Sequence, residues 1–61
     1  MKKNQVRLGM RVEAGRRGTE DHDTGEVLDI DPRGEPGHEV YVGWDSLSKS
    51  WCDANGLRET A

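Results

Sequence analysis

The run VYVGWD at residues 40–45 constrains the fold more than any other stretch of the chain. It alternates strictly, so its two valines and its tryptophan share one face of a strand while its tyrosine, glycine and aspartate share the other. A strand of this kind needs neighbouring strands to cover its apolar face. The run therefore predicts a strand over about residues 38–44 in a small sheet-based domain, with Trp44 in the core and Tyr41 on the outer face.

Two strands are predicted before this run. Apolar residues occupy every second position from 6 to 14, which favours an extended segment with a bend at Gly9 and a strand centred on residues 10–14. Residues 24–31 predict the next strand, in which two apolar side chains three apart both point inward only if a bulge lies near residues 28–29. Residues 32–37 hold both prolines and two glycines, and we expect them to end that strand.

Two shorter strands are predicted after it, over residues 49–52 and 57–59, with a short turn of 3₁₀ helix between them. The loop before residue 49 decides where Trp51 lies. A loop of two or four residues places Trp51 opposite Val42 in the core. A loop of three residues places it opposite Gly43, on the outer face near Tyr41.

The chain is long enough for one domain of modest stability, because sixty-one residues bury only roughly 60% of the surface that the unfolded chain exposes. Val, Ile and Leu are few and Phe is absent, a composition close to that of disordered chains. The small net charge of −3 and the regular apolar spacing favour folding. We expect a flexible N-terminus over residues 1–5 and a single domain over residues 6–61.

The sequence holds no recognisable motif for catalysis or metal binding. The single cysteine, Cys52, excludes an internal disulfide and a cysteine pair for zinc, and it fits a reduced, cytoplasmic setting. The potential ligands at residues 20–23 are consecutive and cannot easily converge on one ion. No nucleophile elbow, phosphate loop, signal-peptide pattern or membrane-length apolar run occurs. We therefore expect no enzyme, no metal, no cofactor and no membrane partner.

Charge is divided unevenly along the chain. Residues 1–18 hold six basic side chains and one acidic one, whereas residues 19–61 hold three basic and eleven acidic side chains. The basic segment is a candidate surface for nucleic acid. Its members are Lys2, Lys3, Arg7, Arg11, Arg16 and Arg17.

The chain resembles a known architecture in the order and spacing of its glycines, valines and tryptophans. The matching positions are Gly9-Met10-Arg11-Val12, Thr24-Gly25-Glu26-Val27, Val42-Gly43-Trp44-Asp45, Trp51 and Leu57. They resemble the SH3-like small barrels of the Tudor, KOW and mind-bomb type over most of residues 8–59. The resemblance implies an all-β, five-stranded SH3-like barrel that binds peptides, modified side chains or nucleic acid without catalysis. The similar barrel of type II dihydrofolate reductase is catalytic, but its Val-Gln-Ile-Tyr stretch has no match here.

Two functions follow as hypotheses. The first is an interaction module that binds a protein partner through a sheet edge or through an outer aromatic face with Tyr41, Trp51 and Asp45. The acidic balance of the chain makes a basic partner plausible. The second is a nucleic-acid-binding accessory protein that uses the basic segment. Assembly into a homo-oligomer is compatible with both, because so small a core gains from burying more surface.

Overall fold

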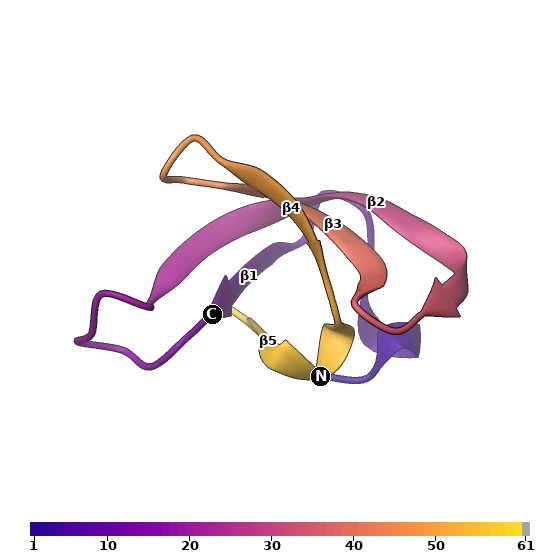
Figure 1. Cartoon of the computed structure of the whole chain (residues 1–61), viewed down its shortest axis with the longest axis horizontal. Helices are drawn as coiled ribbons and strands as arrows, with labels where there is room; N and C mark the ends of the chain where they lie inside the picture. The colour runs from indigo at the N-terminus through magenta and orange to yellow at the C-terminus, as the bar shows by residue number, and fades with distance from the viewer. Residues whose placement is uncertain (61) are drawn as a thin grey trace.

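The computed structural model describes residues 1–60, which form one antiparallel sheet of five strands and two 3₁₀ turns (Figure 1). The sheet order is β4-β3-β2-β1-β5. This confirms the predicted all-β class, the five strands and the 3₁₀ turn before the last of them. Within these residues no ladder joins β4 to β5, so the closed SH3-like barrel stays a prediction. The elements in chain order are η1 (Lys3–Gln5), β1 (Arg11–Ala14), β2 (Asp23–Glu35), β3 (His38–Trp44), β4 (Lys49–Cys52), η2 (Ala54–Gly56) and β5 (Leu57–Glu59).

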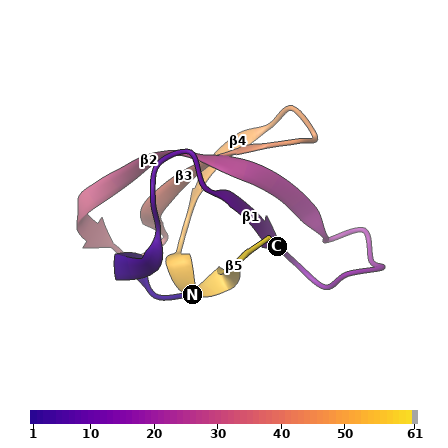
Figure 2. The same cartoon turned by 180° about the vertical axis from the view of Figure 1, so that it is seen from behind.

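Strand β2 organises the sheet, because it pairs with β1 near its start and with β3 along its length. Figures 1 and 2 show it arching over the molecule, with η2 and β5 beneath the arch in both views. Its register with β3 moves from Val27 opposite Val42 to Asp29 opposite Tyr41, so Leu28 is an extra residue. This is the predicted bulge.

The expected end of this strand at Pro32 is wrong. Strand β2 continues to Glu35, which pairs with His38 at the start of β3. A second register shift separates Ile30 from Glu35. Pro32, which has no N–H to donate, therefore lies in a stretch with no regular ladder. The turn itself falls at residues 36–37.

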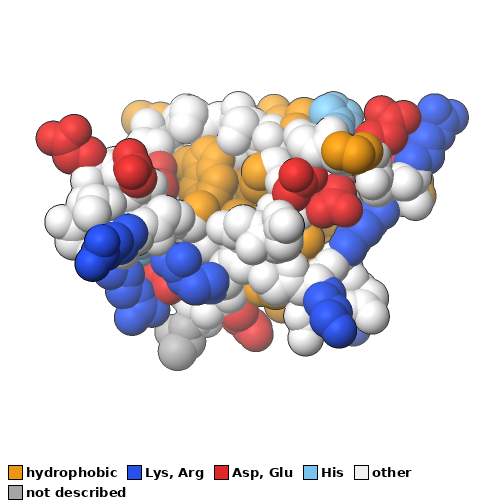
Figure 3. All heavy atoms as spheres, turned by 60° about the horizontal axis from the view of Figure 1, so that its bottom comes forward, with side chains coloured by type: hydrophobic (Ala, Val, Ile, Leu, Met, Phe, Trp, Pro, Cys, Tyr) orange, Lys and Arg blue, Asp and Glu red, His pale blue; other side chains and the backbone are white. Residues whose placement is uncertain are grey.

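The core lies on the concave side of the sheet and is made of small aliphatic side chains. Trp44 packs against this core but is only partly buried, so its predicted burial is met in part. Figure 3 shows apolar side chains reaching the surface in the middle of one face. The fully buried members are Val6, Val12, Val27, Val40, Val42, Ala54 and Leu57.

The N-terminal segment contacts the other end of the chain. The amino group of Met1 donates hydrogen bonds to the carbonyl oxygens of Ala54 and Leu57, at 3.1 and 2.7 Å. These contacts place η1 beside η2 and β5. The expected flexibility of residues 1–5 stays a prediction. Among residues 1–60, no helix has the length and apolarity needed to cross a membrane.

Candidate functional site

The β3–β4 hairpin decides which face of the sheet carries Trp51. The amide of Trp44 donates to the carbonyl of Ser48 at 2.8 Å, which leaves a loop of three residues, 45–47. Trp51 then lies opposite Tyr41 on the outer face. The outer of the two predicted positions is thus confirmed, although Trp51 faces Tyr41 and not Gly43.

Three aromatic rings gather there. The ring centroids of Tyr41 and Trp51 are 5.0 Å apart, with an angle of 36° between the ring planes. His38 stacks on Trp51 at 4.0 Å and 16°. We call these three residues the aromatic cluster. Alternation from Val40 places His38 on the inner face of the strand. The sequence pattern therefore did not predict its contact with Trp51.

An open groove of about 420 Å³ lies beside this cluster. The second half of β2 supplies one wall and the rings of His38 and Trp51 belong to the other. Its full lining is Asp29, Ile30, Asp31, Pro32, Arg33, Glu35, His38 and Trp51. The groove therefore combines apolar surface with three carboxylates and a single basic side chain.

Asp31 is the most enclosed of these carboxylates, with a side chain that is 16% exposed. Its Oδ1 accepts the amide N–H of Arg33 at 2.9 Å, and its Oδ2 lies 3.4 Å from Nδ1 of His38. The amide hydrogen bond, with the nearby His38, holds the pKa of Asp31 below its ordinary value. The groove therefore keeps a negative charge at neutral pH.

Asp45, the third residue of the predicted site, pairs with residues of β1 and β2. Its Oδ2 accepts a 2.6 Å hydrogen bond from Nη2 of Arg11 and another from the hydroxyl of Thr24. These bonds hold the pKa of Asp45 below its ordinary value. Asp45 directly follows β3, and its carboxylate links the β3–β4 loop to β1 through Arg11 and to β2 through Thr24.

The basic candidates do not form one surface either. Arg11 is paired with Asp45, and Arg17 donates to Glu13 at 2.7 Å. Arg7 donates to main-chain carbonyls near η1. Figures 1 and 2 place η1 and the loop between β1 and β2 at opposite ends of the molecule. Lys2 and Lys3 are therefore remote from Arg16 and Arg17.

Glu13 forms an ionic cluster that the sequence did not reveal. It is only 4% exposed although it lies on the outer face of β1. Arg17, Arg58 and His22 surround its carboxylate, with His22 Nε2 at 2.9 Å from Oε2. These hydrogen bonds, that from Arg17 first, lower its pKa to about 2. The cluster ties the β1–β2 loop and β5 to β1.

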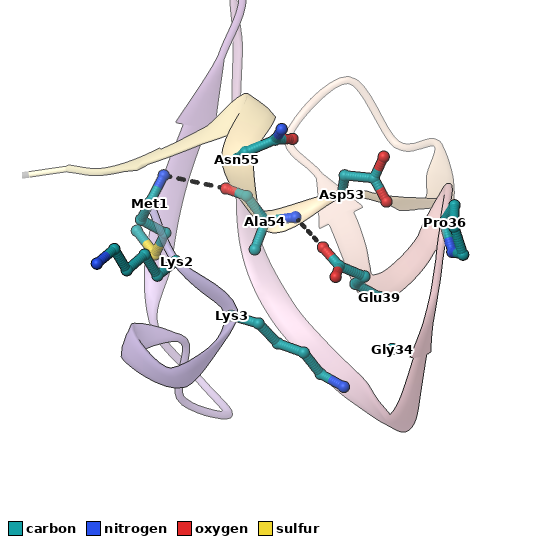
Figure 4. A pocket seen from close by; sticks show the side chains of 9 residues that line it. All are labelled: Met1, Lys2, Lys3, Gly34, Pro36, Glu39, Asp53, Ala54 and Asn55. Carbon is teal, nitrogen blue, oxygen red and sulfur yellow. Dashed lines mark hydrogen bonds between the residues drawn. The ribbon is translucent and has the colours of Figure 1, made fainter.

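A second hollow of about 400 Å³ lies between η1, η2 and the β2–β3 turn (Figure 4). One of its carboxylates, that of Glu39, already accepts the amide of Ala54 at 2.9 Å. Lys2 and Lys3 line one side of it, and Glu39 and Asp53 line the other, so charges of both signs face the hollow (Figure 4). Within residues 1–60, no group of three or more His, Cys, Asp or Glu side chains is placed to hold a metal ion.

Comparison of the chain with protein-family models, curated proteins and solved structures found no match.

Proposed function

We propose that the chain is a non-enzymatic interaction module whose outer β3–β4 face binds a protein partner. The observation that supports this most is the pairing of Tyr41 with Trp51 on neighbouring strands, with His38 stacked against them. Tyrosine and tryptophan supply large contact area at low entropic cost and dominate many protein interfaces.

Charge near the cluster favours a basic partner. Asp29 pairs with Tyr41 across β2 and β3, and the adjacent groove adds Asp31 and Glu35. A partner segment with positive side chains would meet complementary potential on arrival, which raises association rates and selects against acidic partners.

Position in the sheet also suits partner binding. Strand β4 is the outermost strand on its side, so one of its edges carries main-chain groups without a neighbouring strand among residues 1–60. An extended partner segment can pair with such an edge, and Trp51 would lie beside it.

Binding of nucleic acid is the less supported function. Two of its six candidate cations are already in ion pairs, and the remaining ones are split between both ends of the molecule. A phosphate backbone laid across β3 would meet acidic side chains instead.

Selection from a random peptide library displayed on phage tests the proposal. We expect enriched peptides that bind the parent chain and lose binding when Tyr41→Thr and Trp51→Thr are combined. Threonine keeps the strand propensity, so the fold should persist. A matched variant, Leu8→Thr, changes an exposed apolar residue outside the cluster and should bind as the parent does.

Circular dichroism and thermal melting establish that each variant is folded before binding is compared. Enriched peptides that bind the double variant as tightly as the parent would contradict the proposed face. A selection that enriches nothing dependent on either ring would contradict peptide recognition by this surface.

A further inference from the structure

We propose that the groove beside Trp51 receives an arginine side chain of the partner, with its guanidinium stacked on the aromatic wall and paired with Asp31. This inference rests on the proposed function and specifies which side chain the interaction face selects.

The groove has room for one long side chain. Its volume of about 420 Å³ is formed between the irregular half of β2 and the His38–Trp51 stack. Ile30 and Pro32 supply apolar surface along which the methylene stem of an arginine can lie. The groove is open to solvent, so a partner side chain can enter without a change in the main chain.

The charge of the groove calls for a cation. Three of its lining residues are acidic and one, Arg33, is basic. Among residues 1–60, the carboxylates that pair with arginine or lysine are those of Asp45 and Glu13, which lie elsewhere. No arginine or lysine among residues 1–60 therefore forms an ion pair with the carboxylates of the groove, and Lys3 acts on Asp31 only through its charge at longer range.

Asp31 is the anchor because it is both enclosed and held in place. Its two hydrogen bonds fix its orientation, and a carboxylate that accepts two bonds still has lone pairs for two more. Ion pairs at a half-buried carboxylate are screened less by salt than those at an exposed one.

The geometry favours arginine over lysine. A guanidinium is planar, so it can stack on an aromatic ring and still direct paired N–H groups at a carboxylate in its own plane. A lysine ammonium is a compact and strongly hydrated charge that gains less from a flat wall. The rings of His38 and Trp51 line the groove next to Asp31.

A substitution of Arg33 provides a test of the charge argument. It is exposed and lines the groove, so its positive charge opposes an incoming guanidinium. Removing it in Arg33→Gln should tighten binding about twofold to threefold, as expected when a like charge near an ion pair is deleted.

The experiment is an NMR titration of the ¹⁵N-labelled chain with three peptides of four repeats each, Gly-Ser-Arg, Gly-Ser-Lys and Gly-Ser-citrulline. We expect the arginine peptide to shift the indole signal of Trp51 and the amides of residues 29–38. The indole of Trp44, which donates to Ser50 at 2.9 Å, is the internal control. Citrulline keeps the shape of arginine without its charge, and we expect it to bind at least about tenfold more weakly.

Variants then assign the contact. Asp31→Asn should weaken the arginine peptide about fivefold, whereas Glu59→Gln, the same loss of charge on exposed β5, should leave its affinity unchanged. Equal binding of the citrulline or lysine peptide, or equal losses in the two variants, would overturn the inference. So would the absence of any shift at Trp51. If peptides without arginine are selected on the aromatic cluster and bind Asp31→Asn normally, the inference fails while the proposed function stands.

Discussion

Gly25 and Gly43 lie on neighbouring strands, and different atoms cover them. A Cβ atom at Gly25 would lie 2.6 Å from the carbonyl oxygen of Gly43 and 2.8 Å from Cγ1 of Val42. At Gly43 the nearest atom would be Cδ1 of Leu28 at 2.9 Å. The side chain that covers Gly43 is thus that of the bulged Leu28.

These contacts predict unequal costs for the same substitution. Gly25→Ala should destabilise the fold by about 1–3 kcal/mol, because a main-chain oxygen in a paired strand cannot move aside. Gly43→Ala should change stability by less than about 0.5 kcal/mol, since Leu28 is 41% exposed and can rotate away. Urea unfolding of both variants checks the difference. Equal losses would show that Leu28 is as fixed as the main chain.

Leu47 combines full exposure with a strained main chain. Its side chain is 95% exposed and its φ is 73°, a left-handed conformation that costs a residue with a Cβ roughly 1–2 kcal/mol. Asparagine tolerates this region better. Leu47→Asn should therefore stabilise the chain by about 0.5–1 kcal/mol.

Leu8→Asn is the matched control for this change. Leu8 is also exposed, at 67%, and has no positive φ. Urea midpoints should rise for Leu47→Asn alone. A gain of the same size in both variants would attribute the effect to lost surface apolarity and not to the hairpin conformation.

At the scale of elements, periodicity predicted most of the strands. Residues 38–44, 49–52 and 57–59 form strands as expected, and the mismatch of Val27 and Ile30 correctly indicated a bulge. The continuation of β2 past Pro32 could not be predicted, because proline is tolerated only where the ladder is already interrupted. That interruption depends on tertiary pairing with β3, which the local sequence does not encode.

The Glu13 cluster links β1, the β1–β2 loop and β5, so the stability of the fold should depend on the ionisation of Glu13. Because the pKa of Glu13 falls to about 2 in the folded chain, its stabilising effect is present above the ordinary value of about 4.5. That effect is lost as the pH falls from about 4.5 toward 2. Glu13→Gln should therefore show a smaller loss of stability between pH 6 and pH 3 than the parent, in urea unfolding.

Glu59→Gln serves as the control and should lose as much stability between pH 6 and pH 3 as the parent does. An NMR titration that follows the carboxyl carbon of Glu13 measures the pKa of this group directly in the parent chain. A carboxyl that titrates near its ordinary pKa, or a Glu13→Gln variant with the parent's pH dependence, would contradict the role given to this cluster.

For the whole molecule, the sequence predicted the fold class better than the site. Tyr41 on the outer face followed from alternation, whereas the place of Trp51 depended on a loop length that the sequence left open. Asp45 and the basic segment were grouped by chain position. In the structure Asp45 pairs with Arg11, and Lys2 and Arg16 lie at opposite ends of the molecule. Those groupings depend on the tertiary arrangement of the strands and loops, which sequence spacing does not report.

The most direct test of the central claim compares two sets of variants for binding of a selected peptide and of a short DNA duplex at low salt. We expect Tyr41→Thr to weaken the peptide at least about tenfold, as loss of an aromatic anchor does. Combined Arg16→Ala and Arg17→Ala should change its affinity less than about twofold, since surface charges remote from an interface contribute little. The duplex should show no saturable binding. A duplex complex whose affinity falls with salt by a log–log slope of about −0.9 per phosphate contacted, and which the double arginine change abolishes, would contradict the account.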